Sequence, residues 1–284
     1  MVFSKGDVTI DRIVEMQAAK FDPLTFFPGL TKELLAENMH WLEGRGIDKE
    51  TGNVMLAVQS YVIRTPHHTI LIDTCVGNHK ERPSHPFWNQ MQGTQYMDGL
   101  AKLGLTVDDI DYVLCTHLHV DHVGWNTRLL DGRWVPTFPK AKYVFAKGEL
   151  DFWNTGNPPP WITDSVLPII AAGQDQLVAD DTALNDHIRL EPTPGHTPHH
   201  VAVQVGRGQT DAVMAGDLIH SPLQMRYPEI SMRADHDQAQ SAVTRRKFLE
   251  CYCDTPVLMC TAHFPLPSCG HVTRHGNGFT FKPG

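Results

Sequence analysis

Residues 114–125, in the middle of the chain, read L-C-T-H-L-H-V-D-H-V-G-W and constrain the fold more than any other stretch. Within six positions they place four side chains that can bind a metal ion: His117, His119, Asp121 and His122. The apolar residues 112–114 before them predict a buried strand, and Gly124 predicts a turn after it. We therefore expect a sheet protein in which a strand ends in a metal-binding loop.

The spacing of these four residues explains their chemistry. Residues two apart on an extended chain point to the same side, so His117 and His119 can present their imidazoles to one cation. Asp121 and His122 lie past the strand end, where the chain turns and can reach a second cation. Imidazole and carboxylate together suit Zn²⁺ and neighbouring first-row metals. An isolated His-x-His pair is more often a surface or core feature, whereas four such residues after a strand favour a metal site.

Three further apolar segments are each followed by a candidate ligand. These ligands are His196 in T-P-G-H-T-P, Asp217 in A-G-D and His263 in T-A-H. Side chains at strand ends converge on the rim of a sheet, which is where binding sites are built. This placement is compatible with a site that these three residues share with the first four.

The run H-L-H-V-D-H and the three downstream residues together resemble the metallo-β-lactamase superfamily. The signature of that family is H-x-H-x-D-H, followed by a His, a bridging Asp and a final His. The resemblance implies an α/β fold, an αββα four-layer sandwich of the metallo-β-lactamase type. It covers nearly the whole chain, from the strand that ends at Asp73. We expect residues 1–284 to form one domain with two βαβ-like halves, roughly 1–185 and 186–284.

The resemblance also assigns the ligands and the reaction. It implies two divalent metal ions, with Zn²⁺ as the first expectation, and a bridging hydroxide that attacks a lactone or other carboxylic ester. One ion is expected on His117, His119 and His196, the other on Asp121, His122 and His263, and Asp217 is expected to bridge them. Asp121 is also a candidate to pass a proton to the leaving group. Asp73 is expected to support the ligand loop from behind; the alternative is an aspartate that caps a turn.

Within the superfamily, the C-terminal third resembles the branch that contains methyl parathion hydrolase and related lactonases. The segments concerned are 216–224, 244–246 and 262–272. In the acyl-homoserine-lactone enzymes, a tyrosine three residues after the bridging aspartate touches the substrate oxygen. Here that position is His220, a candidate catalytic residue that either hydrogen-bonds substrate or packs as a structural histidine.

Substrate selection is less constrained by the sequence. Five aromatic residues are candidates for a pocket that takes a bulky leaving group, although a core position is favoured for any one of them: Trp88, Trp125, Phe152, Trp153 and Trp161. Arg226 and Arg233 are candidates to meet a carboxylate, with a surface position as the default. A lactonase or esterase is expected first and a phosphotriester hydrolase second. A mononuclear-iron dioxygenase and a non-catalytic metal-binding module are further alternatives.

Composition limits the partners. The formal net charge of −8 disfavours a nucleic-acid binder, which needs a basic face. No apolar run of about 18 residues predicts a membrane span, and no secretory signal is visible. The six cysteines include no C-x-x-C pair and are expected to be reduced. We expect a cytoplasmic protein with a small-molecule substrate. The aromatic-rich segment 21–30 is expected to pack on the core, or alternatively to line the substrate pocket or a homodimer interface.

Overall fold

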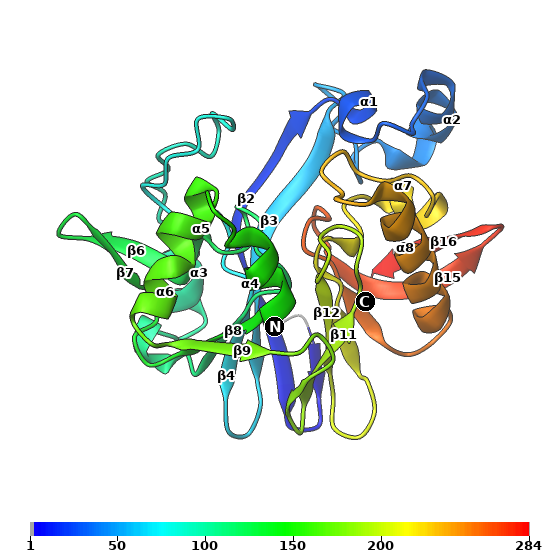
Figure 1. Ribbon diagram of the computed structural model, residues 1–284. Helices are drawn as coiled ribbons and strands as arrows, with labels where there is room; N and C mark the ends of the chain where they lie inside the picture. Colours follow the sequence, from blue (N-terminus) through cyan, green and yellow to red (C-terminus); the bar gives the residue numbers. More distant parts are fainter. Residues whose placement is uncertain (1–2, 284) are drawn as a thin grey trace. The chain divides into compact units, whose positions relative to one another are not determined.

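The computed structural model describes residues 3–283 (Figure 1). Contacts along the chain divide it into two compact units. The first unit contains residues 1–16 and 58–180, and the second contains residues 17–57 and 181–284. The division falls inside two long strands, β2 (Val8–Phe21) and β3 (Val54–Arg64). The expectation of a single domain stays a prediction.

The first unit is built on a mixed sheet whose strand order is β1-β2-β3-β4-β5-β8-β9. Strands β4, β5, β8 and β9 run parallel, so their carboxyl ends lie at one edge of the sheet. The remaining strands of this unit are β1 (Phe3–Lys5), β4 (Thr69–Ile72), β5 (Tyr112–Leu114), β6 (Thr127–Leu130), β7 (Arg133–Pro136), β8 (Lys142–Ala146) and β9 (Asp175–Val178). Its helices are α3 (Gln95–Lys102), α4 (Lys147–Trp153), α5 (Pro160–Ser165) and α6 (Leu167–Ala171), with 3₁₀ turns at Val107–Asp109 and Gly124–Asn126.

The second unit is built on a second mixed sheet with the order β10-β11-β12-β13-β14-β15-β16. In this sheet β13 and β14 pair in parallel, and the other neighbouring strands pair antiparallel. The strands are β10 (Ala183–Asn185), β11 (Ile188–Pro192), β12 (Val201–Val205), β13 (Ala212–Met214), β14 (Leu258–Cys260), β15 (Cys269–His275) and β16 (Gly278–Pro283). The helices are α1 (Pro23–Phe26), α2 (Lys32–Leu42), α7 (Pro222–Arg226) and α8 (Gln238–Tyr252), with a 3₁₀ turn at Gly216–Leu218.

Helix α8 shows how the sequence determines this packing. Asp237 caps its first turn, because the Asp237 carboxylate accepts the amide of Gln240 at 2.9 Å. Phe248, Leu249 and Tyr252 lie on one face and are buried in the core of the second unit. The sequence of residues 237–251 predicts a helix, and the structure confirms it within one residue at each end.

Most strands predicted before a candidate ligand are present, with small differences in their ends. The segment 21–30 holds the short helix α1, which was not expected, and its Phe26, Phe27 and Leu30 are buried, which confirms the prediction of core packing. The sequence of residues 165–172 predicts a helix, and the structure has the shorter helix α6 there, preceded by α5 and with Pro168 in the first turn of α6. Strands β1, β9, β10, β15 and β16 were missed. None of the helices in residues 3–283 combines the length and the apolar character that a bilayer span requires.

The long loop of residues 75–93 is held to the rest of the first unit by a buried cation. The Lys80 ammonium donates to the Thr127 hydroxyl at 2.6 Å and to the Asp164 carbonyl at 3.1 Å. It also lies 3.6 Å from the centre of the Trp134 ring. Burial lowers the pKa of Lys80 from its ordinary 10.5 to about 7, against the opposing effect of the Asp164 carboxylate.

This shift predicts a pH-dependent contribution to stability. Between pH 7 and 10.5 the unfolded chain binds more protons at Lys80 than the folded chain does, so the contribution of Lys80 increases as pH rises through this window. The free energy of unfolding of the wild type, relative to Lys80→Met, is expected to rise by about 1 kcal/mol per pH unit from pH 7 to 9. Urea denaturation measures it. Lys140→Met, at a lysine whose side chain is 69% exposed, is the control. If the difference in the free energy of unfolding between the wild type and Lys80→Met does not change with pH, the prediction is contradicted.

Candidate metal centre

The four predicted ligands of the first unit lie together in the loop that follows β5. The Nε2 atom of His117 is 3.0 Å from the Nδ1 atom of His119, and the rings of His117 and His122 are 4.1 Å apart at their centres. The Nε2 atom of His122 lies 3.8 Å from the Asp121 carboxylate. The loop thus gathers three imidazoles and one carboxylate at the carboxyl edge of the parallel strands.

Asp73, at the end of the neighbouring strand β4, orients this loop. Its carboxylate accepts the backbone N–H of Thr116 at 2.8 Å and the Thr116 hydroxyl at 2.9 Å. It also lies 2.9 Å from Nδ1 of His122, so Nε2 of that ring faces Asp121. The supporting role expected of Asp73 is confirmed. The Thr116 hydroxyl is 3.1 Å from Nδ1 of His117, and Nε2 of that ring faces His119.

Gly124, two residues after the H-x-H-x-D-H signature, lies close to the backbone of Val76. A Cβ atom on Gly124 would lie 1.8 Å from the carbonyl oxygen of Val76, so no other residue fits there. Glu15 of β2 holds both partners in place. Its carboxylate accepts the amides of Val76 and Gly77 at 2.9 and 3.2 Å, and the indole N–H of Trp125 at 2.6 Å.

Helix α4 supports the loop from a second direction. The carboxylate of Glu149, which is buried, accepts the backbone N–H of Leu118 at 3.2 Å and the indole N–H of Trp153 at 2.7 Å. The indole of Trp161 donates to the carbonyl of Leu118 at 2.9 Å. Leu118, which separates two ligand candidates, is therefore fixed through both of its backbone polar groups.

In the second unit, three histidines converge on Asp217, which follows β13. One carboxylate oxygen of Asp217 lies 2.9 Å from Nε2 of His263. The other lies 3.3 Å from Nε2 of His196 and 3.1 Å from Nε2 of His220. All four side chains are buried, and Asp217, His220 and His263 alone offer three ligand atoms within 4.8 Å of one another.

The Nδ1 atoms of His196 and His263, which do not face Asp217, also have polar partners. Nδ1 of His196 lies 2.8 Å from the carboxylate of Asp235, and Nδ1 of His263 lies 2.8 Å from the carbonyl of Ala57. The backbone N–H of Asp217 donates to Nε2 of His200 at 3.0 Å. These contacts select the ring nitrogen that each ligand candidate presents to the cluster.

Arg245 on α8 fixes Asp235 in turn. Its fully buried guanidinium donates to the Ser241 hydroxyl at 2.8 Å and lies 3.3 Å from the Asp235 carboxylate. Further bonds run to backbone carbonyls, at Leu218, Pro228 and Ile230. An arginine with this many acceptors ties the loop after β13 to the loop that carries Asp235.

The buried carboxylates of Asp217 and Asp235 favour a positive charge beside them. Burial alone would lower the pKa of His196, but its hydrogen bonds to Asp217 and Asp235 outweigh burial and raise the pKa to about 9. Burial also opposes ionisation of Asp235, yet the His196 contact and the Arg245 charge hold the pKa of Asp235 well below its usual range. A proton on His196 balances the two carboxylates, and a bound cation would replace it.

The donor sets therefore fit divalent cations. Each unit offers imidazole nitrogens and carboxylate oxygens, the combination that zinc accepts. His122, His196 and His263 each engage Nδ1 with a carboxylate or carbonyl, as metal-bound histidines do. A purely structural cluster of histidines would have no need for Nε2 atoms directed at one carboxylate.

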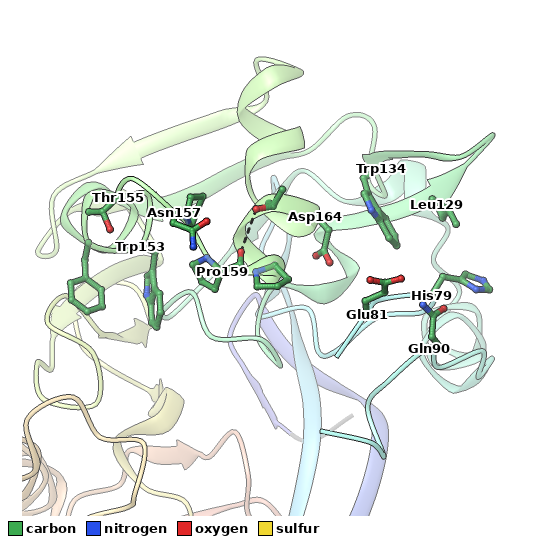
Figure 2. A pocket seen from close by; sticks show the side chains of 14 residues that line it. His79, Glu81, Gln90, Leu129, Trp134, Trp153, Thr155, Asn157, Pro159 and Asp164 are labelled. Carbon is green, nitrogen blue, oxygen red and sulfur yellow. Dashed lines mark hydrogen bonds between the residues drawn. The ribbon is translucent and has the colours of Figure 1, made fainter. Parts of the chain in front are cut away.

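A groove of about 1210 Å³ lies in the first unit (Figure 2). Trp153 lies at one end, where its ring is 5.3 Å from the ring of His119, and Trp134 lies at the other end, with Asp164 between them. Phe152 also lines the groove. Trp88 and Trp125 are instead buried in the core of this unit, so the core interpretation was correct for them.

Two mixed sheets with histidines and aspartates gathered at strand ends define an α/β protein with a candidate metal centre. Residues 54–252, well over half of the chain, match the metallo-β-lactamase superfamily. The chain belongs to this superfamily, and the α/β fold class of the metallo-β-lactamase type expected from the sequence is confirmed.

Three solved structures illustrate the likeness. The hydrolase AbOPH of the β-lactamase superfamily is 22% identical, with a TM-score of 0.82 over 99% of this chain and 96% of its own. AidC, a dizinc quorum-quenching lactonase, is 22% identical, with a TM-score of 0.78 over 99% and 96%. A probable metal-dependent hydrolase from Staphylococcus aureus is 19% identical, with a TM-score of 0.78 over 99% of both chains. At these identities the likeness establishes the fold. A search of curated protein sequences gave no match.

Several residues that build the site were not found from the sequence. Asp235 and His200 have no distinctive spacing relative to the residues that they contact. Arg245 carried a weak signal, because it lies four residues before Leu249 and so on the buried stripe of α8, where a charge needs a partner. Arg233 is exposed, as the default for a surface arginine predicted.

The orienting role of Asp235 can be tested directly. Asp235→Asn keeps the shape of the side chain but removes the charge beside His196, so the affinity for zinc is expected to fall about 10- to 100-fold. Competition with a chromophoric chelator measures the affinity, and thermal unfolding reports whether the variant remains folded. Asp186→Asn, at an aspartate whose side chain is 80% exposed, should bind zinc like the wild type. Equal affinities for the wild type and Asp235→Asn would contradict the role.

Proposed function

We propose that this protein is a metal-dependent hydrolase of lactones or other carboxylic esters. Two divalent cations, with zinc as the first candidate, are held by seven residues: His117, His119, Asp121, His122, His196, Asp217 and His263. The observation that carries the proposal is that each unit gathers its own part of this set, with the Nδ1 atoms of His122, His196 and His263 already engaged. Membership of the superfamily and the likeness to the dizinc lactonase AidC support the same assignment.

Different residues of the chain have different roles in the proposed hydrolysis. When bound, two neighbouring divalent cations polarise a carbonyl oxygen and lower the pKa of a water molecule, which supplies the nucleophile for hydrolysis. Asp217 faces imidazoles through both carboxylate oxygens, which suits the bridging role between two cations. Asp73 and Asp235 keep the histidines in one orientation, so little reorganisation is needed when substrate arrives.

Asp121 is proposed as the residue that passes a proton to the leaving group. Its side chain is 11% exposed, against 5% for Asp73 and 4% for Asp217. A proton carrier must reach both substrate and water, and Asp121 is the most accessible of these three carboxylates. Its place beside His122 also keeps it within the ligand loop.

His220 is proposed to position Asp217. Burial lowers the pKa of His220 despite the neighbouring Asp217 carboxylate, and Nε2 of the ring lies 3.1 Å from that carboxylate. The ring stacks on His263 with centres 5.3 Å apart, and Phe26 packs edge-on against it at 5.9 Å. These contacts favour the positioning role, and a hydrogen bond from His220 to substrate stays a prediction.

The groove beside His119 supports an ester with a sizeable apolar group. Its Phe152 and Trp153 lie at the end that meets the ligand loop. The structures of AidC and of an N-acyl homoserine lactone hydrolase are described with N-hexanoyl-homoserine products, which are ring-opened lactones with an acyl chain. We propose a substrate of the same chemical class, with its apolar group in the groove.

Asp217→Asn tests the bridging role. The amide keeps the shape but loses the charge that two cations require, so kcat is expected to fall at least about 10³-fold, or about 4 kcal/mol of transition-state stabilisation. Metal content by elemental analysis and hydrolysis of an aryl ester are measured together. Asp186→Asn serves again as the exposed control. Unchanged hydrolysis by Asp217→Asn would remove this residue from the mechanism.

A substrate screen tests the reaction class. Zinc-loaded protein is assayed with acyl-substituted γ-lactones, aryl esters and phosphotriesters, before and after treatment with a chelator. We expect kcat/KM for lactones or carboxylic esters to exceed that for phosphotriesters by about tenfold or more, a preference of roughly 1.4 kcal/mol. Chelation should remove all of these activities, and zinc should restore them. A phosphotriester preference would reverse the substrate class, and activity that survives complete metal removal would refute the metal-dependent mechanism.

A further inference from the structure

A second cavity lies in the second unit and contains none of the candidate metal ligands. It has a volume of about 220 Å³ and is bounded by the end of α2, by α7, by residues 264–267 and by β16. Trp41, Phe264 and Phe281 provide aromatic walls, and the rings of Phe264 and Phe281 pack edge-on at 5.2 Å. Ligand pockets for drug-sized molecules are usually larger, so this cavity suits a small organic molecule.

Two arginines give the cavity its charge. Arg45 and Arg226 line it, and no aspartate or glutamate does. Among residues 3–283, neither arginine has a carboxylate within ion-pairing distance, whereas Arg82, Arg245 and Arg246 each do. The cavity therefore offers positive charge that the described part of the chain does not neutralise.

Arg226 carries the clearest sign of a missing partner. Its guanidinium lies over the ring of Trp41, 4.8 Å from the ring centre, which holds the planar group against the cavity wall. Its Nε atom is buried and has no hydrogen-bond partner in the described part of the chain. A buried N–H that has lost water and found no acceptor is costly, so an acceptor supplied by a ligand would relieve it.

We propose that this cavity binds a small organic carboxylate with an aromatic or short aliphatic body. The planar guanidinium of Arg226 matches a carboxylate in two-point geometry, and Arg45 adds charge at the same cavity. The aromatic walls take the hydrocarbon body and disfavour inorganic anions, which hold their water more strongly. The proposal does not depend on the hydrolase function, because no residue of the candidate metal centre lines the cavity.

Benzoate is a suitable probe, and ligand-observed NMR titration of the zinc-loaded full chain measures its affinity. Arg226→Gln is expected to weaken binding about tenfold or more, since it removes the charge-assisted pair. Arg45→Gln should weaken binding severalfold. Arg189→Gln, at an exposed arginine on β11 outside the cavity, should leave the affinity unchanged. The candidate metal ligands are intact in all of these variants, so any benzoate on the metal gives the same background in each.

Two further probes define the ligand class. Benzyl alcohol, which has the same body without the charge, and inorganic phosphate, which has charge without the body, are each expected to bind at least about tenfold more weakly than benzoate. Arg226→Lys keeps the charge and loses the planar fork, and should fall between the wild type and Arg226→Gln. Thermal unfolding checks each variant, and Arg45→Gln decides the matter if Arg226→Gln does not fold.

The outcomes separate clearly. Wild-type affinity for benzoate in both Arg226→Gln and Arg45→Gln would overturn the proposal. Equal binding of benzyl alcohol would show an apolar cavity with no anion site, and equal binding of phosphate would show an anion site with no preference for a carboxylate; either result overturns the assigned class. A crystal soaked with benzoate should place its carboxylate on Arg226.

Discussion

Hydrogen bonds between buried carboxylates and imidazoles underlie the candidate metal centre in both units. Asp73 lies against His122 in the first unit, and Asp235 lies against His196 in the second. Each contact holds one ring nitrogen, so the other is presented at a fixed angle. Buried charge of this kind is unfavourable unless it is compensated. The carboxylates that orient the histidines therefore also favour a bound cation, because its positive charge would balance their buried negative charge.

Buried cations extend this support beyond the ligands. Arg245 joins α8 to the loops around Asp235 and Leu218, so the packing of one helix against its sheet also sets the position of the carboxylate behind His196. Lys80 plays a comparable part in the first unit, where it ties the loop of residues 75–93 to Thr127 and to the Asp164 carbonyl. Both residues are fully buried. Several acceptors compensate part of the desolvation cost, while burial still lowers the pKa of both residues.

Local patterns in the sequence were enough for part of this arrangement. Apolar strand runs and the spacing of the signature depend on neighbours in the chain, and the structure agrees with them. Asp73 was found through resemblance to a family. Asp235 was not found, because its contact with His196 spans 39 positions and depends on the path of the loops between them. The strand β15 was missed because its residues C-G-H-V-T-R-H include few apolar ones, so the segment shows no strand pattern of its own. Its extended conformation depends on pairing with β16.

The candidate metal ligands follow strand ends, whereas loops form the groove. The ligand residues and the shape of the groove can therefore vary separately. The ligand candidates follow strands such as β5 in the first unit and β13 and β14 in the second, and Asp73, which supports them, follows β4. Pairing between neighbouring strands fixes these strand ends. The groove is walled by the β6–β7 hairpin and by residues 152–164, outside the main sheet. A fold of this kind can therefore keep its candidate metal ligands while the loops that form the groove change.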